Sequence, residues 1–295
     1  SYHYFNLVRL FGPVFIVTER ITAKEARKYD RSSIEDVYNQ IITDLNLIID
    51  NSFLPDSYAT EAGRITSWAA KTLLAKVYLT RGELGKAKTL LEDVKKSGHD
   101  ILKDYSKVFS IENEMNEEII FAVRYKAGNY GLGNPFGNYF ASLNSGDAVI
   151  NSDGLGQNYP TTTLMNAYNA TGKDKRKGVT VSEGYEDSNK GYVEDFYVTK
   201  YLSPVKTKND GEKDVPILRY ADVLLMLAEI ENETGNMGPA LGYLNQIRER
   251  AGLDLLTTDD ITNKYELRMA IENERFLEFA YENQRFFDLV RTNRY

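Results

Sequence analysis

RYADVLLMLAEIENETGNMGPALGYLNQIRERAGL, residues 219–253, contains two helical patterns separated by a glycine, and this stretch decides the fold. In the first pattern, apolar residues recur one turn apart until Gly235 interrupts them. The second pattern has Pro239 just inside its start and Gly252 where a helix C-cap is expected. The stretch therefore predicts an antiparallel helical hairpin.

A second stretch, SWAAKTLLAKVYLTRGELGKAKTLLEDVKKSG at residues 67–98, repeats this punctuation. Alignment of the two stretches pairs Leu74, Ala75, Gly82, Ala87, Leu91 and Val94 with Leu227, Ala228, Gly235, Ala240, Leu244 and Ile247. Alanines on both sides of a turn glycine let two helices cross closely, as in tetratricopeptide units of about 34 residues. Because such hairpins bury their apolar faces by stacking, the sequence predicts a mainly α, tetratricopeptide-like solenoid.

Two more helices are expected near the N-terminus. RSSIEDVYNQIITDLNLIID, residues 31–50, begins with a serine cap at Ser32 or Ser33 and has one apolar face. SYHYFNLVRLFG, residues 1–12, ends at Gly12 and is the expected partner helix. Since this helix starts almost at residue 1, we expect the sequence to come from a longer chain whose preceding repeat is missing.

The central part of the chain has a different character. Residues 126–215 are rich in Gly, Asn, Asp, Ser, Thr and Tyr, with short β-like runs at 118–125 and 195–201 and a helical pattern at 161–168. We therefore expect one domain with helical repeats at 1–117, a loop-rich insertion carrying short β segments at 118–215, and helical repeats at 216–295. Long ordered loops on a solenoid usually serve binding.

Composition excludes several classes of function. A formal net charge of -7 argues against nucleic acid as a partner, because phosphate contacts require clustered Lys and Arg. Zero Cys and two His exclude disulfides, thiolate chemistry and a histidine metal cluster. No apolar run approaches the roughly 20 residues that span a bilayer. The sequence predicts no cofactor and no metal site.

Several stretches, in this order, resemble the SusD/RagB family over most of the chain. They are SYHYFNLVRLFG, SIEDVYNQIITDL, AKTLLAKVYLTRGELGKA, LMNAYNATGKDKR, VTKY, LRYADVLLMLAEIENETG, LNQIRERAGL and IENERFLEFAYENQRFFDLVR. The most specific block is the last one, where the family pattern is matched by Glu274, Arg275, Glu278, Glu282, Arg285, Phe286, Phe287, Asp288, Leu289 and Arg291. The chain departs from the pattern at Asn283 and Gln284, where a glycine is usual.

The resemblance implies an outward-facing outer-membrane lipoprotein of the Bacteroidetes. Members of the family bind glycans or other nutrients and cap a SusC-like TonB-dependent transporter. The resemblance implies no catalysis, and it places the only membrane attachment in a lipid anchor outside this sequence. It also implies that segments of the family fold are absent at both ends of the chain.

Two alternatives to glycan binding stay open. A helical-repeat scaffold would hold a peptide or protein on its concave face. A glycoside hydrolase would need paired carboxylates, and Glu274, Glu278 and Glu282 are spaced four residues apart on one expected helix face. Helical spacing also brings Arg275 beside Glu278, which favours a salt-bridged helix junction because an adjacent Arg lowers the pKa of a carboxyl.

The expected ligand contacts lie in the insertion, where aromatic faces and short polar side chains occur together. The candidates are Tyr130, Asn134, Phe136, Tyr139, Asn151, Asp153 and Tyr159. Sugars need this mixture, since aromatic faces stack on the C–H surface of the ring and polar groups bind its hydroxyls. The competing interpretation is that each residue anchors its own loop. Two other motifs, GLGNPFG at 131–137 and NSDG at 151–154, are read as loop and turn, and Asp174–Arg176 as a structural corner.

Overall fold

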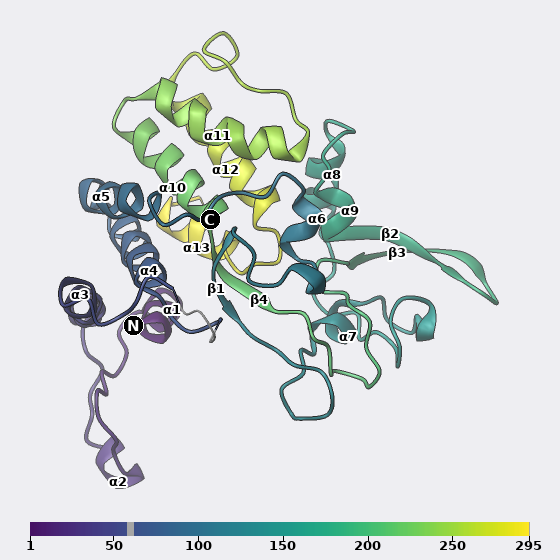
Figure 1. Cartoon of the computed structure of the whole chain (residues 1–295), viewed down its shortest axis with the longest axis horizontal. Helices are drawn as coiled ribbons and strands as arrows, with labels where there is room; N and C mark the ends of the chain where they lie inside the picture. The colour runs from purple at the N-terminus through teal and green to yellow at the C-terminus, as the bar shows by residue number, and fades with distance from the viewer. Residues whose placement is uncertain (58–61, 295) are drawn as a thin grey trace. The chain divides into compact units, whose positions relative to one another are not determined.

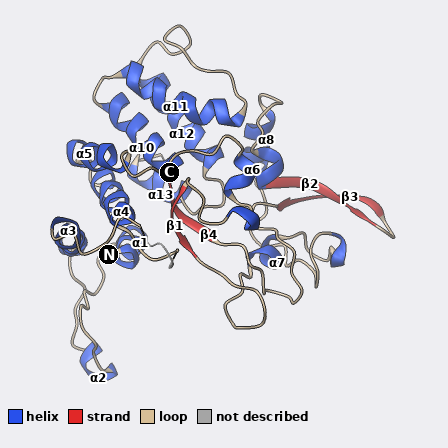
Figure 2. Cartoon of the chain, viewed as in Figure 1, coloured by secondary structure: helices blue, strands red, loops and turns tan. Residues whose placement is uncertain are grey.

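Two units make up the chain, Ser1–Ser97 and Gly98–Tyr295, in a computed structural model that describes residues 1–57 and 62–294. Figure 1 traces both units from the N-terminus to the C-terminus, and Figure 2 separates their helices from their strands. Both units are mainly helical, and the strands lie in the second unit. The predicted mainly α fold is confirmed.

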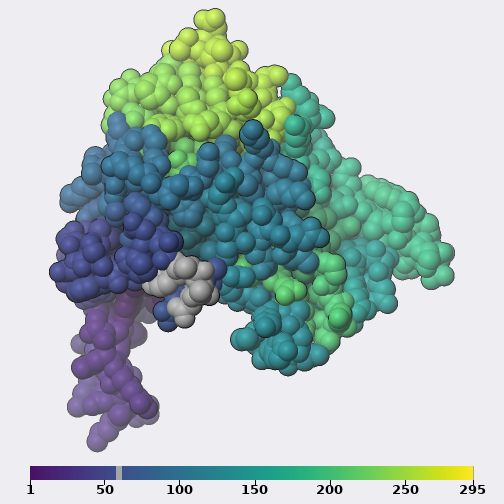
Figure 3. Space-filling view, in the orientation of Figure 1, coloured from purple at the N-terminus to yellow at the C-terminus, as the bar shows by residue number. Residues whose placement is uncertain are grey.

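The first unit is a layer of helices that pack in chain order. Its helices are α1 (Tyr2–Phe11), α2 (Ala23–Ala26), α3 (Ile34–Asp50), α4 (Ser67–Thr80) and α5 (Leu84–Val94). α1 packs on α3, α3 on α4 and α4 on α5, around the fully buried side chains of Ile41, Leu74 and Leu91. The short helix α2 lies at the tip of an extension between α1 and α3 (Figures 1 and 3).

The helix boundaries of this unit follow from local signals. Ser33, one of the two predicted caps, accepts a hydrogen bond from the backbone N–H of Asp36 at 3.1 Å. α4 ends at Thr80, and Gly82, two residues further on, has a left-handed φ of 74°. The backbone N–H of Glu83 then donates to the carbonyl of Tyr78 at 2.9 Å, which closes the helix end. The predicted hairpin of α4 and α5 is confirmed.

The second unit contains the other hairpin and the helices packed on it. These helices are α10 (Tyr220–Glu233), α11 (Met237–Ala251), α12 (Lys264–Glu278) and α13 (Arg285–Arg291). α12 packs against both α10 and α11, so α10 is buried along most of its length. Gly235 and Gly252 end the two hairpin helices with φ of 87° and 76°. The hairpin read from the sequence is therefore present with the predicted terminators.

The insertion joins short helices and two small sheets to this helical body. The elements between α5 and α10 are α6 (Tyr105–Val108), η1 (Ile111–Asn113), β1 (Ile119–Val123), α7 (Phe136–Phe140), η2 (Gly146–Ala148), α8 (Thr162–Asn169), α9 (Lys177–Thr180), β2 (Val181–Asp187), β3 (Gly191–Val198) and β4 (Val215–Arg219). α6 and η1 precede the predicted insertion at 118–215, and β4 extends past its end. β1 pairs antiparallel with β4, and β2 with β3. The β2–β3 ribbon extends away from the helices of its unit (Figures 2 and 3).

The strands differ from the prediction in number. β1 lies within the first predicted run, β3 overlaps the second at residues 195–198, and α8 lies at the predicted helical segment. Their partners β2 and β4 were not predicted, because a short apolar run such as VPILR at 215–219 does not distinguish a strand from the start of a helix. GLGNPFG was read as a loop, yet α7 begins at Phe136 within it. Among the described residues, no helix has the length and apolar character to cross a membrane.

Candidate functional site

The carboxylates that suggested a hydrolase lie inside a buried group of ion pairs, here called the ion-pair cluster. Its members are Glu118, Asp174, Arg176, Lys200, Arg219, Arg250, Glu274, Glu278 and Glu282. Glu278 is at its centre, 2.6 Å from Arg250, 3.0 Å from Arg219 and 3.3 Å from Arg176. These residues belong to α11, α12, the turn after α12, β4 and the insertion, so the cluster ties these parts of the chain together.

The charges around Glu278 make it a poor general acid. Burial alone would raise the pKa of Glu278, but Arg250, Arg219 and Arg176 together hold that pKa well below its usual range. A carboxylate that stays ionised has no proton to give to a leaving group. The buried position of these three arginines also removes the solvent access that a substrate would need. The arrangement is that of a structural junction.

The structural junction was predicted, but its pairing was not. Arg275 was expected beside Glu278, whereas it donates hydrogen bonds to Asp222 at 2.8 Å and to Asp288 at 2.9 Å. The reason is geometric, because α10 and α13 present carboxylates to Arg275, while arginines distant in sequence reach Glu278. The predicted corner at Asp174 and Arg176 is present, with Arg176 donating to Asp174 at 2.7 Å.

Three of the predicted ligand residues use their polar atoms within the loops. Asn134 is 2% exposed, and its amide donates to the carbonyl of Lys213 at 2.5 Å while its oxygen accepts from the N–H of Phe136 at 2.8 Å. Asn151 donates to the carbonyls of Val205 and Lys206, each at 3.1 Å. Asp153 accepts from the backbone N–H groups of residues 146 and 154 at 3.0 and 2.8 Å. Here the loop-anchoring interpretation describes what these side chains do.

Asn138 is the central anchor of these loops, and it was missed. Its amide donates to the carbonyls of Asn151 and Asp153 at 3.1 and 2.8 Å, and its oxygen accepts from the N–H of Asn209 at 2.8 Å. The side chain is completely buried. Nothing in the sequence separates Asn138 from the other asparagines of the insertion, because its partners are backbone groups of distant loops.

The four predicted aromatic residues divide into an inner and an outer pair. Phe136 stacks on Phe140 with ring centroids 5.3 Å apart and meets Tyr139 at 6.4 Å, so Phe136 and Tyr139 belong to a partly buried aromatic group. Tyr130 and Tyr159 are 68% and 43% exposed. These two tyrosines lie on separate turns, and they offer the aromatic faces that a sugar ring can reach.

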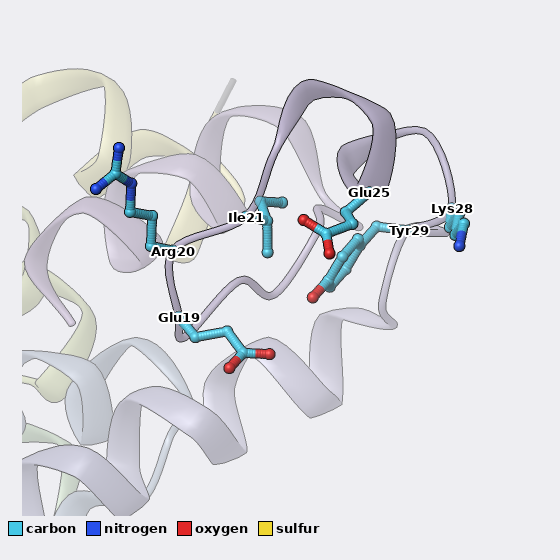
Figure 4. A pocket seen from close by; sticks show the side chains of 6 residues that line it. All are labelled: Glu19, Arg20, Ile21, Glu25, Lys28 and Tyr29. Carbon is cyan, nitrogen blue, oxygen red and sulfur yellow. The ribbon is translucent and has the colours of Figure 1, made fainter.

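A pocket of about 350 Å³ lies in the extension of the first unit, where Figure 4 shows its lining. It is lined by Glu19, Arg20, Ile21, Glu25, Lys28 and Tyr29. The side chains of Glu25 and Tyr29 lie side by side and extend in the same direction, whereas Lys28 lies away from them (Figure 4). The Glu25 carboxylate already accepts from the backbone N–H of Thr22 at 2.8 Å in a capping box. The pocket is thus lined mainly by charged groups, one of which caps α2.

A second, smaller cavity lies in the second unit beside β1. Apolar side chains and three charged residues, Glu114, Lys213 and Asp214, line it. Burial lowers the pKa of Lys213 to about 8, against a smaller opposing effect of Glu114. Burial also raises the pKa of Glu114, and the neighbouring Asp214 adds to this. Within residues 1–57 and 62–294, no group of three or more Asp, Glu or His side chains is placed to hold a metal ion.

Helical hairpins combined with an ordered, loop-rich insertion place the chain among tetratricopeptide-like proteins. Two family models match it: one described as the SusD family covers residues 178–295, and one described as "Starch-binding associating with outer membrane" covers residues 1–79. The chain belongs to the SusD-like family, as its motifs predicted.

Individual relatives agree with this family. A SusD-like protein of Bacteroides ovatus is 30% identical over 91% of this chain and 55% of its own length. The chain spans about half the length of the curated relatives that it matches. A crystal structure of a SusD-like protein from Bacteroides fragilis has a TM-score of 0.81 and 26% identity, and the match covers 98% of this chain and 66% of that one. A structure named "Laminarin binding SusD-like protein" has the same TM-score and identity, with 99% and 68% covered.

Proposed function

We propose that the protein binds a glycan at the outer surface of the outer membrane and delivers it to a SusC-like TonB-dependent transporter, without catalysis. Family membership and the likeness to a laminarin-binding protein support glycan as the ligand class. The description of the family model for residues 1–79 supports the location. In this proposal a lipid anchor outside the given sequence provides the attachment.

The observation that carries the proposal is the exposed ring of Tyr130 on a polar loop. An aromatic side chain that is 68% exposed leaves apolar surface in water, and a sugar ring that stacks on it removes this surface from water. Asn129 and Asn158 flank the two exposed tyrosines with side chains that can bind hydroxyls. We therefore place the ligand on the loops that carry Tyr130 and Tyr159, with Tyr130 as the principal contact.

The structure gives less support to catalysis. Glu274 and Glu278 are completely buried, and each is neutralised by arginine at 3.3 Å or less. A retaining or inverting hydrolase needs one protonated carboxyl beside an accessible glycosidic bond. Glu274 and Glu278, the carboxylates whose spacing raised the hydrolase alternative, are neither protonated nor accessible.

Affinity electrophoresis against laminarin, starch and other polysaccharides tests the proposal. We expect Tyr130→Ala to weaken binding by about two- to twelvefold, since an aromatic contact contributes about 0.5–1.5 kcal/mol. Tyr159→Ala should have a smaller effect. Tyr29→Ala, in the pocket of the first unit, is the matched control and should bind like the wild type. If only Tyr29→Ala weakened binding, the ligand would lie in that pocket, and the proposed site would be wrong.

The proposed transporter partner needs a separate test. An affinity tag on the protein in its native cells should co-purify a large TonB-dependent receptor after detergent extraction. Recovery of the tagged protein without such a receptor would contradict the delivery role. If members of a peptide library bound to the protein and none of the glycans did, the result would favour the helical-repeat scaffold instead.

A further inference from the structure

We propose that Asp210 is a positioning residue that holds Tyr130 ready for ligand, an inference that rests on the proposed function. One carboxylate oxygen of Asp210 accepts two backbone hydrogen bonds, from Gly128 and from Asn129, each at 2.8 Å. Hydrogen bonds to an ionised acceptor are stronger than neutral ones. Asp210 thereby fixes the backbone immediately before Tyr130 from a segment about 80 residues further along the chain.

The base of this turn is closed independently of Asp210. The N–H of Lys126 donates to the carbonyl of Leu132 at 2.8 Å. Asn134 and Gly211 exchange two backbone hydrogen bonds, at 2.8 and 3.0 Å. Residues 126 and 132 are thus joined, and the chain just beyond them is fixed to residue 211. Only the tip, which carries Tyr130, depends on the Asp210 carboxylate.

Two glycines allow close contacts here, one between the two segments and one within the turn. A Cβ on Gly133 would lie 2.5 Å from the Cα of Asp210, so any larger residue would push the segments apart. A Cβ on Gly128, whose φ is +123°, would lie 2.6 Å from Cε2 of Tyr130. The ring of Tyr130 therefore lies against the bare backbone of Gly128. The ammonium group of Lys126 stands over the same ring, 5.5 Å from its centroid.

These contacts restrain the ring while leaving most of it open to solvent. A turn that is ordered before binding loses little conformational freedom when the ligand arrives, which increases affinity without any added ligand contact. Asp210 contributes to binding through this order. It contacts the turn, and Tyr130 contacts the sugar.

The test compares glycan affinities of four variants: Tyr130→Ala, Asp210→Ala, Asp210→Asn and the double variant Tyr130→Ala with Asp210→Ala. We expect Asp210→Ala to weaken binding roughly as much as Tyr130→Ala, by about two- to twelvefold. The double variant should bind no more weakly than Tyr130→Ala alone, because Asp210 acts through the tyrosine. Asp210→Asn keeps an acceptor oxygen and should recover part of the loss.

Asp187→Ala is the matched control. Asp187 accepts hydrogen bonds from the backbone N–H groups of Asn189 and Lys190 at 2.8 and 3.0 Å, in the turn between β2 and β3. The substitution removes the same kind of interaction from another turn, and binding should not change. Hydrogen exchange provides a readout without ligand: amides 128 and 129 should exchange faster in Asp210→Ala and Asp210→Asn, with the rest of the chain unchanged.

The outcomes separate the two proposals. If Tyr130→Ala leaves affinity unchanged, the proposed ligand site is wrong and the role of Asp210 is wrong with it. If Tyr130→Ala weakens binding while both Asp210 variants bind like the wild type, the site stands and the positioning role fails. Additive losses in the double variant would also overturn it, as would unchanged exchange at amides 128 and 129.

Discussion

Arg250 donates a hydrogen bond from Nη2 to Oε1 of Glu278 at 2.6 Å, and both side chains are at most 2% exposed. The pair joins α11 to the last turn of α12. The other Arg250 nitrogen, Nη1, donates to Glu118, just before β1, at 2.9 Å. One arginine therefore holds the hairpin, the final long helix and the start of the insertion in a fixed arrangement. A buried ion pair of this kind contributes little net stability, but the loss of one partner is costly.

Glu278→Gln tests this dependence. The substitution leaves Arg176, Arg219 and Arg250 with one fewer buried anion, so we expect the free energy of unfolding in urea to fall by about 3–5 kcal/mol. Glu183→Gln is the control, because Glu183 pairs with Lys177 at the surface, where such a pair contributes at most about 1 kcal/mol. Similar losses in both variants would show that burial does not distinguish the two pairs.

Acid should unfold the protein partly through the same residue. The folded-state pKa of Glu278 is held below its unfolded value, so its contribution to stability is complete above the unfolded pKa of roughly 4.3 and declines as the pH falls below it. Thermal melting between pH 7 and pH 3 should show a steeper decline in the wild type than in Glu278→Gln. Parallel curves would contradict the expected role.

A second prediction concerns the end of α11. Gly252 has a left-handed φ of 76°, and Gly252→Ala should lower the free energy of unfolding by about 1–2 kcal/mol, the usual cost of this conformation for a residue with a Cβ. Gly242 lies within the same helix, and a Cβ there would meet nothing within 4 Å. Gly242→Ala should therefore stabilise the protein, by up to about 1 kcal/mol. The prediction fails if the two variants shift the urea midpoint in the same direction.

A third prediction uses the lowered pKa of Lys213. This pKa is about 8 in the folded chain and roughly 10.4 in the unfolded chain, so between these values the unfolded state binds more protons. The free energy of unfolding should therefore rise as the pH increases from about 8 toward 10, by up to about 3 kcal/mol. Lys213→Met should remove the rise, whereas Lys208→Met, on the surface, should keep it. A rise that persists in Lys213→Met would assign the effect to another group.

A fourth prediction concerns the alanines that allow the hairpin helices to cross closely. Ala75 and Ala228 are completely buried in α4 and α10. Leucine at either position adds three carbons to a filled interior, and we expect a loss of about 1–3 kcal/mol in the free energy of unfolding. Ala26→Leu, on the exposed surface of α2, should change it by less than about 0.5 kcal/mol. A tolerated leucine at both buried positions would contradict the close crossing.

The helical hairpins were predictable because their signals are local. Gly82, Gly235 and Gly252 each end a helix by adopting a conformation that other residues resist, and the sequence displays them at the right spacing. The same holds for Ser33, whose side chain caps the helix that begins after it. A reader of the sequence needs no knowledge of distant partners to place these elements.

The site was less predictable because its contacts are not local. Glu118 and Arg250 are 132 positions apart, and no periodic pattern relates them. In the sequence, Asn134 and Tyr130 look equally suitable for binding a sugar. In the structure, the side chain of Asn134 is hydrogen-bonded to backbone groups of residues 136 and 213, whereas Tyr130 faces solvent. Composition pointed to residues 126–215 as the candidate binding segment. Only the folded structure distinguishes the residues that anchor its loops from those that are exposed.

The ion-pair cluster also decides which parts of the insertion can be exchanged. Its contributions from this segment are Glu118, Asp174, Arg176 and Lys200, and the exposed turns at residues 126–132 and 156–159 lie between the first two of them. A graft that replaced residues 126–160 with loops of another design would leave every charge of the cluster matched. Exchange of residues 126–160 is therefore a route to engineered variants that carry a new loop surface on the same helical body.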